Sequence, residues 1–199
     1  MESLHEELRR KYFQELSAFD AELGRFLESL GGYKVLQDTV FVLLGDHGTD
    51  LCERFPTIVE GGPGVTLRGE QLHVPLIVRV PSWLDWHGRI ADQVRLLDVA
   101  PTVCELAGVP IPQEWQGRSL APLVRGEKGA EELPAFASGC TIKPDRAAVR
   151  EHGYSYVRVL RPKEPRGRFF LEPLADEQHY DLRADPNEER NVAQEQPEM

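Results

Sequence analysis

The chain has 199 residues, of which 41% are hydrophobic, so it can bury a core and form one domain, alone or with a small appendage. Its formal net charge of -10 argues against nucleic acid or an anionic membrane as the main partner, because phosphate groups attract basic surfaces. The net charge does not exclude a small anionic substrate, because a metal ion or an arginine at the site can bind the substrate locally.

Targeting signals and cysteines bear on the compartment. The first ten residues lack the apolar region of a signal peptide, and no segment has the apolar length of a membrane span. We therefore expect a cytoplasmic protein, an expectation that depends on Met1 being the natural start. Cys52, Cys104 and Cys140 are too few and too far apart for a disulfide framework or a thiolate zinc site, so free thiols are expected. The sequence gives no indication of oligomeric state.

The first half of the chain predicts a helix followed by strands. Apolar residues at steps of three or four over residues 4–30 predict an amphipathic helix with one buried stripe, ended by Gly31 and Gly32. Residues 39–48, which read Thr-Val-Phe-Val-Leu-Leu-Gly-Asp-His-Gly, predict a strand buried on both faces, as in a parallel sheet. A long loop over residues 49–69 and a second strand over residues 72–81 follow.

The second half predicts a short strand at residues 94–97 and a helix from Asp98 to Gly108, with Asp98 as its cap. The charged segment 125–134 suggests a boundary, so we expect a main domain over residues 1–125 and a smaller one over 126–199. Short alternating runs predict an antiparallel sheet in the smaller domain, with strands at residues 147–150, 154–160 and 177–182.

Asp46 and His47 are the candidate metal ligands. They follow the predicted strand directly, and loops at the carboxyl ends of strands line the crevice where ligands bind in open α/β sheets. A carboxylate and an imidazole are both metal-binding groups. The alternative interpretation is that Asp46 caps a turn and that His47 is an ordinary loop histidine.

Several segments, in this order, resemble the C-terminal half of the sulfatase family in the alkaline phosphatase superfamily. Residues 19–30 and 39–48 resemble the family helix and its strand with a DHG turn. Residues 72–81, Leu-His-Val-Pro-Leu-Ile-Val-Arg-Val-Pro, resemble the VPLIVR strand of the family. Residues 97–110 resemble the family segment that follows this strand. The segments at residues 117–120 and 180–191 match the G.SL and YDL..DP.E..N patterns.

The resemblance implies an α/β fold, with a largely parallel sheet flanked by helices, and a small C-terminal antiparallel subdomain. It also implies hydrolysis of a small anionic sulfate ester, with a divalent cation, usually calcium, and a formylglycine nucleophile made from a cysteine or serine. By position, Asp46 matches a direct metal ligand. His47 matches a residue that binds the metal or contacts the sulfate.

Two departures from the family pattern affect the functional expectation. No Cys/Ser-x-Pro-x-Arg nucleophile motif occurs in the chain, and the lysine that many relatives place before the second strand is missing. Arg68 is a weak candidate to replace that lysine in contacting the substrate. The alternative is that Arg68 is a solvated charge on a loop. We therefore expect the chain to be inactive alone. The alternatives are a non-catalytic remnant of the same fold, or a phosphate or phosphonate ester hydrolase of the superfamily.

The acidic residues near the C-terminus, Asp181, Asp185, Glu188 and Glu189, lack the alternating ligand spacing and the glycine of a calcium loop. A solvated turn is the expected structure there.

Overall fold

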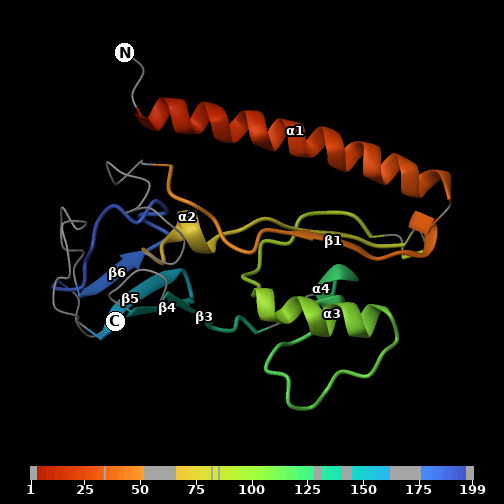
Figure 1. Ribbon diagram of the computed structural model, residues 1–199. Helices are drawn as coiled ribbons and strands as arrows, with labels where there is room; N and C mark the ends of the chain where they lie inside the picture. Colours follow the sequence, from red (N-terminus) through yellow and green to blue (C-terminus); the bar gives the residue numbers. More distant parts are fainter. Residues whose placement is uncertain are drawn as a thin grey trace. The chain divides into compact units, whose positions relative to one another are not determined.

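The structure is a computed structural model that describes residues 4–33, 35–51, 66–81, 83–84, 86–127, 131–139, 145–161 and 176–195 (Figure 1). The chain forms two compact units. Unit 1 comprises Met1–Lys11, Gly45–Val74 and Pro134–Met199, and unit 2 comprises Tyr12–Leu44 and Pro75–Leu133. The division into domains at residues 125 and 126 stays a prediction. No described helix is both long enough and apolar enough to cross a bilayer.

Helix α1 (Leu4–Gly32) confirms the predicted helix, but the expected buried stripe is wrong for the part of the chain that the structure describes. Its apolar residues include several that are 43–52% exposed, namely Tyr12, Phe13, Leu16, Phe19 and Phe26. The periodicity identified the apolar face correctly. It carried no information on whether other residues of this chain cover that face.

Unit 2 contains a two-stranded sheet of β1 (Phe41–Leu44) and β2 (Leu76–Arg79). The strands pair antiparallel, with Phe41 opposite Arg79 and Leu44 opposite Leu76. Both predicted strands are present in shortened form, but β1 has no buried residue and Ile77 is exposed. The expected parallel sheet is therefore not seen among the described strands, and the expectation that β1 is buried on both faces is wrong for this chain.

The turn η2 (Leu96–Asp98) and helix α3 (Val99–Leu106) also belong to unit 2. The predicted helix is confirmed and ends before Gly108, whose φ of +69° suits glycine. The predicted strand at residues 94–97 is wrong, because Arg95 and Asp98 form a capping box that turns the chain there. Asp98 does not cap α3 with its side chain, since its carboxylate accepts instead from Arg95 and from the Arg118 amide.

Helix α4 (Ala121–Val124) directly follows the segment at residues 117–120 that matches the G.SL pattern. Unit 2 also contains the helical turn η1 (Val35–Asp38), which precedes β1. Thr102 joins α3 to α4, because its hydroxyl accepts from the Leu120 amide at 2.7 Å and donates to the Asp98 carbonyl at 2.6 Å.

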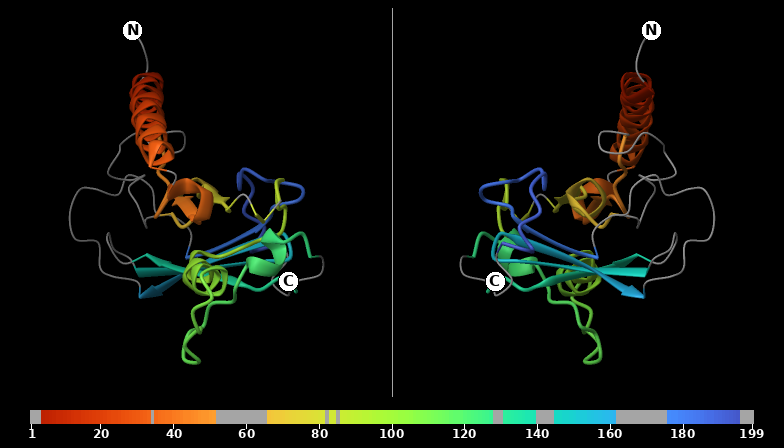
Figure 2. Two further views of the ribbon diagram at one scale, coloured as in Figure 1. Left: turned by 90° about the vertical axis from the view of Figure 1, so that its right-hand side faces the viewer. Right: turned by 90° about the vertical axis from the view of Figure 1, so that its left-hand side faces the viewer.

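Unit 1 contains an antiparallel sheet of four strands in the order β3-β4-β5-β6, which Figure 2 shows side by side in one layer. Three of them, β4 (Asp145–Glu151), β5 (Tyr154–Arg161) and β6 (Glu177–Asp181), confirm the predicted strands. The fourth, β3 (Ala135–Gly139), was not predicted, because Ala-Phe-Ala-Ser-Gly has few residues that favour strands. His152 and Gly153, both with positive φ, form the tight turn between β4 and β5.

One face of this sheet packs against the segment before and within helix α2 (Gly69–Leu72). Leu67, Ala148 and Val157 are buried together, and Leu72 and Ala137 pack against them. Leu67 has a φ of 55°, so the chain turns sharply at the point where this side chain enters the core. The apolar contacts therefore hold α2 on the sheet of unit 1.

Candidate functional site

The turn that follows β1 exposes both predicted metal ligands. The Asp46 side chain is 88% exposed and the His47 side chain 53%. Asp46 Oδ1 accepts from the His47 amide at 2.9 Å, and Asp46 Oδ2 lies 4.0 Å from His47 Nε2. The two side chains are thus near enough for one cation to contact both.

The imidazole of His47 is oriented by the backbone. Its Nδ1 lies 2.9 Å from the carbonyl oxygen of Gly48. A carbonyl oxygen only accepts, so Nδ1 carries the hydrogen and the neutral ring has its lone pair on Nε2. A backbone carbonyl that fixes the tautomer in this way is the usual companion of a metal-binding histidine.

Gly48 closes the turn against α2, within unit 1. Its amide donates to the Gln71 carbonyl at 2.9 Å. A Cβ at this position would lie 2.0 Å from the Glu70 carbonyl oxygen, so only glycine fits without a backbone shift. The conformation of the Asp46–His47 turn therefore depends on where α2 lies.

Arg68, the weak candidate for substrate contact, lies on the sheet of unit 1. Its Nε and Nη2 donate to Gln178 Oε1 at 3.2 and 3.0 Å, and its guanidinium lies 5.1 Å from the centre of the Tyr180 ring. No hydrogen bond or ion pair in the described part of the chain joins it to Asp46 or His47. Its substrate role stays a prediction, and a solvated loop charge is not what the structure shows.

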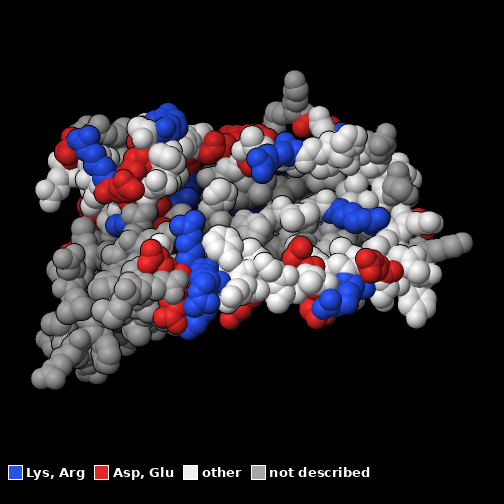
Figure 3. Space-filling model, turned by 90° about the horizontal axis from the view of Figure 1, so that it is seen from above, with Lys and Arg blue, Asp and Glu red and all other residues white. Residues whose placement is uncertain are grey.

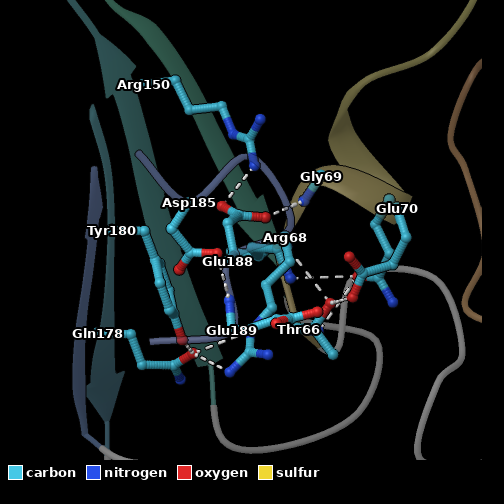
Figure 4. A network of polar contacts seen from close by, with 12 residues as sticks. Thr66, Arg68, Gly69, Glu70, Arg150, Gln178, Tyr180, Asp185, Glu188 and Glu189 are labelled. Carbon is cyan, nitrogen blue, oxygen red and sulfur yellow. Dashed lines mark hydrogen bonds and ion pairs between the residues drawn. The ribbon is translucent and has the colours of Figure 1, made fainter. Parts of the chain in front are cut away.

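Glu188 is the residue whose environment the sequence did not reveal. Its side chain is 1% exposed, and one carboxylate oxygen accepts from Arg150 Nη2 at 2.6 Å (Figure 4). The other oxygen accepts from the Gly69 amide at the start of α2. The expected solvated turn is therefore wrong at Glu188, because partners distant in sequence satisfy its charge inside the protein. Its place in the YDL..DP.E..N pattern was the available signal.

The donors of the turn fit part of a metal shell. Among the described residues, no group of three or more His, Cys, Asp or Glu side chains gathers where it could hold a metal ion. Calcium takes six to eight oxygen ligands, so one carboxylate and one imidazole leave most positions to other donors. On the face drawn in Figure 3, acidic side chains lie next to basic ones.

Comparison with known proteins gives the family context. A family model described as sulfatase matches residues 2–109, and one described as N-sulphoglucosamine sulphohydrolase, C-terminal, matches residues 66–199. Choline-sulfatase of Rhizobium meliloti (strain 1021) is 31% identical over 199 residues, which cover 94% of this chain and 33% of that protein. The chain spans about a third of the length of the curated relatives it matches.

Two solved structures show the same fold. BT4656 in complex with its substrate D-glucosamine-2-N,6-O-disulfate superposes with a TM-score of 0.72 at 22% identity, covering 98% of this chain and 39% of that one. The phosphonate monoester hydrolase of Silicibacter pomeroyi gives a TM-score of 0.67 at 22% identity, covering 88% of this chain and 34% of that one. These structural matches and the two family models, each of which covers more than half of the chain, lead to one conclusion: the chain belongs to the sulfatase family and corresponds to its C-terminal part.

Proposed function

We propose that this chain supplies the Asp46–His47 part of the metal site of a hydrolase that cleaves sulfuric esters, and that the cation is calcium. The observation that carries the proposal is the turn itself. An exposed carboxylate and an imidazole with its lone pair on Nε2 lie 4.0 Å apart, directly after β1. The family to which the chain belongs supports the ester class.

Each residue of the turn has a distinct task. Asp46 contributes the negative charge that holds the cation, and His47 contributes Nε2 while its Nδ1–H stays on the Gly48 carbonyl. Gly48 allows the backbone to pass α2 closely enough for this arrangement. A bound divalent cation neutralises charge on the sulfate oxygens and polarises the ester.

The nucleophile has to come from outside these residues. No Cys/Ser-x-Pro-x-Arg motif occurs in the sequence, so we expect no ester turnover from the 199-residue chain alone. Hydrolysis of an aryl sulfate by the purified chain, abolished in Asp46→Ala, would overturn this part of the proposal.

Calcium titration of the purified chain, followed by calorimetry, tests the metal assignment. We expect weak binding, with a Kd on the order of millimolar, because only part of the shell is present. Asp46→Asn should remove it. Asp38→Asn is the matched control, since Asp38 is an exposed carboxylate just before β1 and its loss should leave binding unchanged. Equal binding by Asp46→Asn would refute the assignment.

A phosphate or phosphonate ester hydrolase is the second candidate, and the match to the phosphonate monoester hydrolase favours it. Tighter binding of zinc or manganese than of calcium, with methylphosphonate bound in preference to sulfate by the metal-loaded chain, would support this candidate. Wild-type chain that binds none of these cations would instead indicate a non-catalytic domain of the same fold.

A further inference from the structure

We propose that Glu188 is a positioning residue for the Asp46–His47 turn and that it acts through α2. The inference rests on the proposed function only in taking that turn to be a metal site. Every residue involved lies in unit 1. The argument has three steps, which lead from the Glu188 carboxylate to α2, from α2 to Gly48, and from Gly48 to the imidazole.

The first step is that the Glu188 carboxylate is fully buried and holds two segments at once. One oxygen accepts from Arg150 on β4 at 2.6 Å, and the other accepts from the Gly69 amide, 119 residues away in sequence. Glu188 itself has a φ of 56°, a conformation that costs free energy for a residue with a Cβ. A buried charge on a strained backbone is retained where its contacts outweigh both costs.

The second step is that α2 depends on such anchors. It is four residues long, too short to be stable by its own hydrogen bonds. Its first residue, Gly69, donates to Glu188, and a Cβ there would lie 3.2 Å from the Glu188 carboxylate. Gln71 Oε1 accepts from the Thr66 and Leu67 amides, which ties the helix to the segment before it.

The third step connects α2 to the candidate ligands. Gly48 donates to the Gln71 carbonyl at 2.9 Å and packs against Glu70 with no room for a side chain. The carbonyl of the same Gly48 accepts from His47 Nδ1 and so orients the ring that presents Nε2. A displacement of α2 would therefore move Gly48 and reorient His47, although Glu188 touches neither residue.

Amide hydrogen exchange measured by NMR on the cation-free chain tests this path. In Glu188→Ala, we expect the Gly48 amide to exchange at least about tenfold faster relative to the amides of β5. Glu188→Gln keeps an acceptor for the Gly69 amide, so it should restore most of the protection. Glu189→Ala is the matched control, because Glu189 is exposed and adjacent in sequence.

The comparison with β5 separates positioning from general stability. A purely structural role would raise exchange at Gly48 and in β5 by the same factor, and that result would overturn the inference. If Glu188→Ala does not fold, the exchange rate of the Gly48 amide relative to the β5 amides is measured in Glu188→Gln. This ratio should then be higher than in the wild type, although by less than about tenfold. Unchanged Gly48 exchange in a folded Glu188→Gln chain and in Glu188→Ala would overturn it as well.

Calcium affinity provides the second readout. Glu188→Ala should weaken binding about tenfold, and Glu188→Gln should weaken it less. Wild-type chain that binds no calcium would refute the metal site, while the exchange ratio would still decide whether Glu188 positions the turn. The two proposals therefore fail in distinguishable ways.

Discussion

Each of the two units contains a buried carboxylate that joins an arginine to a backbone amide of another segment. In unit 1, Glu188 is 1% exposed and accepts from Arg150 and from the Gly69 amide. In unit 2, Asp98 is 3% exposed and accepts from Arg95 and from the Arg118 amide. The chemistry is the same, but the arginine is three residues away for Asp98 and 38 for Glu188.

This difference shows how sequence separation changes what a buried charge does. Asp98 and Arg95 fix a local turn and bring one loop, at Arg118, onto it. Glu188 instead ties β4 and α2 to the C-terminal segment, through partners 38 and 119 residues away in sequence. We therefore expect the loss of the Glu188 contacts to affect a larger part of its unit.

Arg150→Met provides the largest expected effect. It removes the cation beside Glu188 and leaves a buried carboxylate uncompensated, so the free energy of unfolding should fall by about 3–5 kcal/mol. Urea denaturation measures this change. Arg158→Met is the matched control, because its ion pair with Glu177 lies on the same sheet but is largely exposed, and its loss should cost less than about 1 kcal/mol. Equal losses would show that burial does not distinguish the two pairs.

Asp98→Ala should have the next largest effect, about 2–4 kcal/mol, because it leaves the Arg95 guanidinium without its carboxylate. The effect should be smaller than that of Arg150→Met, since the adjacent Arg95 can turn toward water by a local change. Asp92→Ala, at an exposed position of the same unit, should change stability by less than about 0.5 kcal/mol.

The pH dependence of Asp98 gives an independent check. Burial alone would raise the pKa of its carboxyl, but hydrogen bonds from Arg95 and from the Arg118 amide outweigh burial and lower the pKa. The folded pKa thus lies below the unfolded one, so this stabilisation is complete above about pH 4 and is lost as pH falls through the folded pKa. The stability difference between wild type and Asp98→Asn should therefore shrink on acidification, and a constant difference would contradict this origin.

Gly48→Ala should cost about 1–3 kcal/mol, because its Cβ would lie 2.0 Å from the Glu70 carbonyl oxygen and the backbone must shift. Unit 2 offers the matching site at Gly117, where a Cβ would lie 2.1 Å from the Leu97 carbonyl oxygen. Both substitutions should destabilise to a similar extent, but only Gly48→Ala should weaken calcium binding. Gly31→Ala, in open space on α1, is the control and should leave the melting temperature unchanged or slightly raised.

The smallest effect on stability is expected for Asp46→Asn. The side chain is 88% exposed, so the free energy of unfolding should change by less than about 0.5 kcal/mol. Together with the loss of calcium binding expected above, this result would separate an exposed carboxylate that binds a ligand directly from Glu188 and Asp98, whose buried carboxylates hold segments of the chain together. A large loss of stability in Asp46→Asn would remove that distinction.

Much of the local structure was predictable from the sequence. The periodicity of α1, the glycine that follows α3, and the alternation in β4, β5 and β6 all indicated elements that the structure contains. The errors came where particular contacts decide the structure, one of them local and one between strands distant in sequence. The segment expected to be a strand at residues 94–97 is a turn, because Arg95 and Asp98 form a capping box there. Strand β1 pairs antiparallel with β2, although its apolar run suggested a parallel sheet.

The candidate site was predictable only at its surface. Asp46 and His47 stood out because a carboxylate and an imidazole follow an apolar run. The residues that hold this turn in place could not be recognised from the sequence. Gly48, Gly69 and Glu188 are common residue types, and their roles depend on neighbours far away in sequence. Glu188 in particular has polar neighbours in sequence, so its segment reads as a solvated turn until the distant partners of the carboxylate are known.

The contact between Gly69 and Glu188 also has a kinetic consequence. The strands of the unit 1 sheet pair with their sequence neighbours, so the sheet can form through successive hairpins. The Gly69–Glu188 contact spans 119 residues and closes a loop about three times longer than the 38-residue contact between Arg150 and Glu188, an extra entropic cost of about 1 kcal/mol. We therefore expect the sheet to fold first and α2, with the turn that rests on it, to dock in a later and slower step.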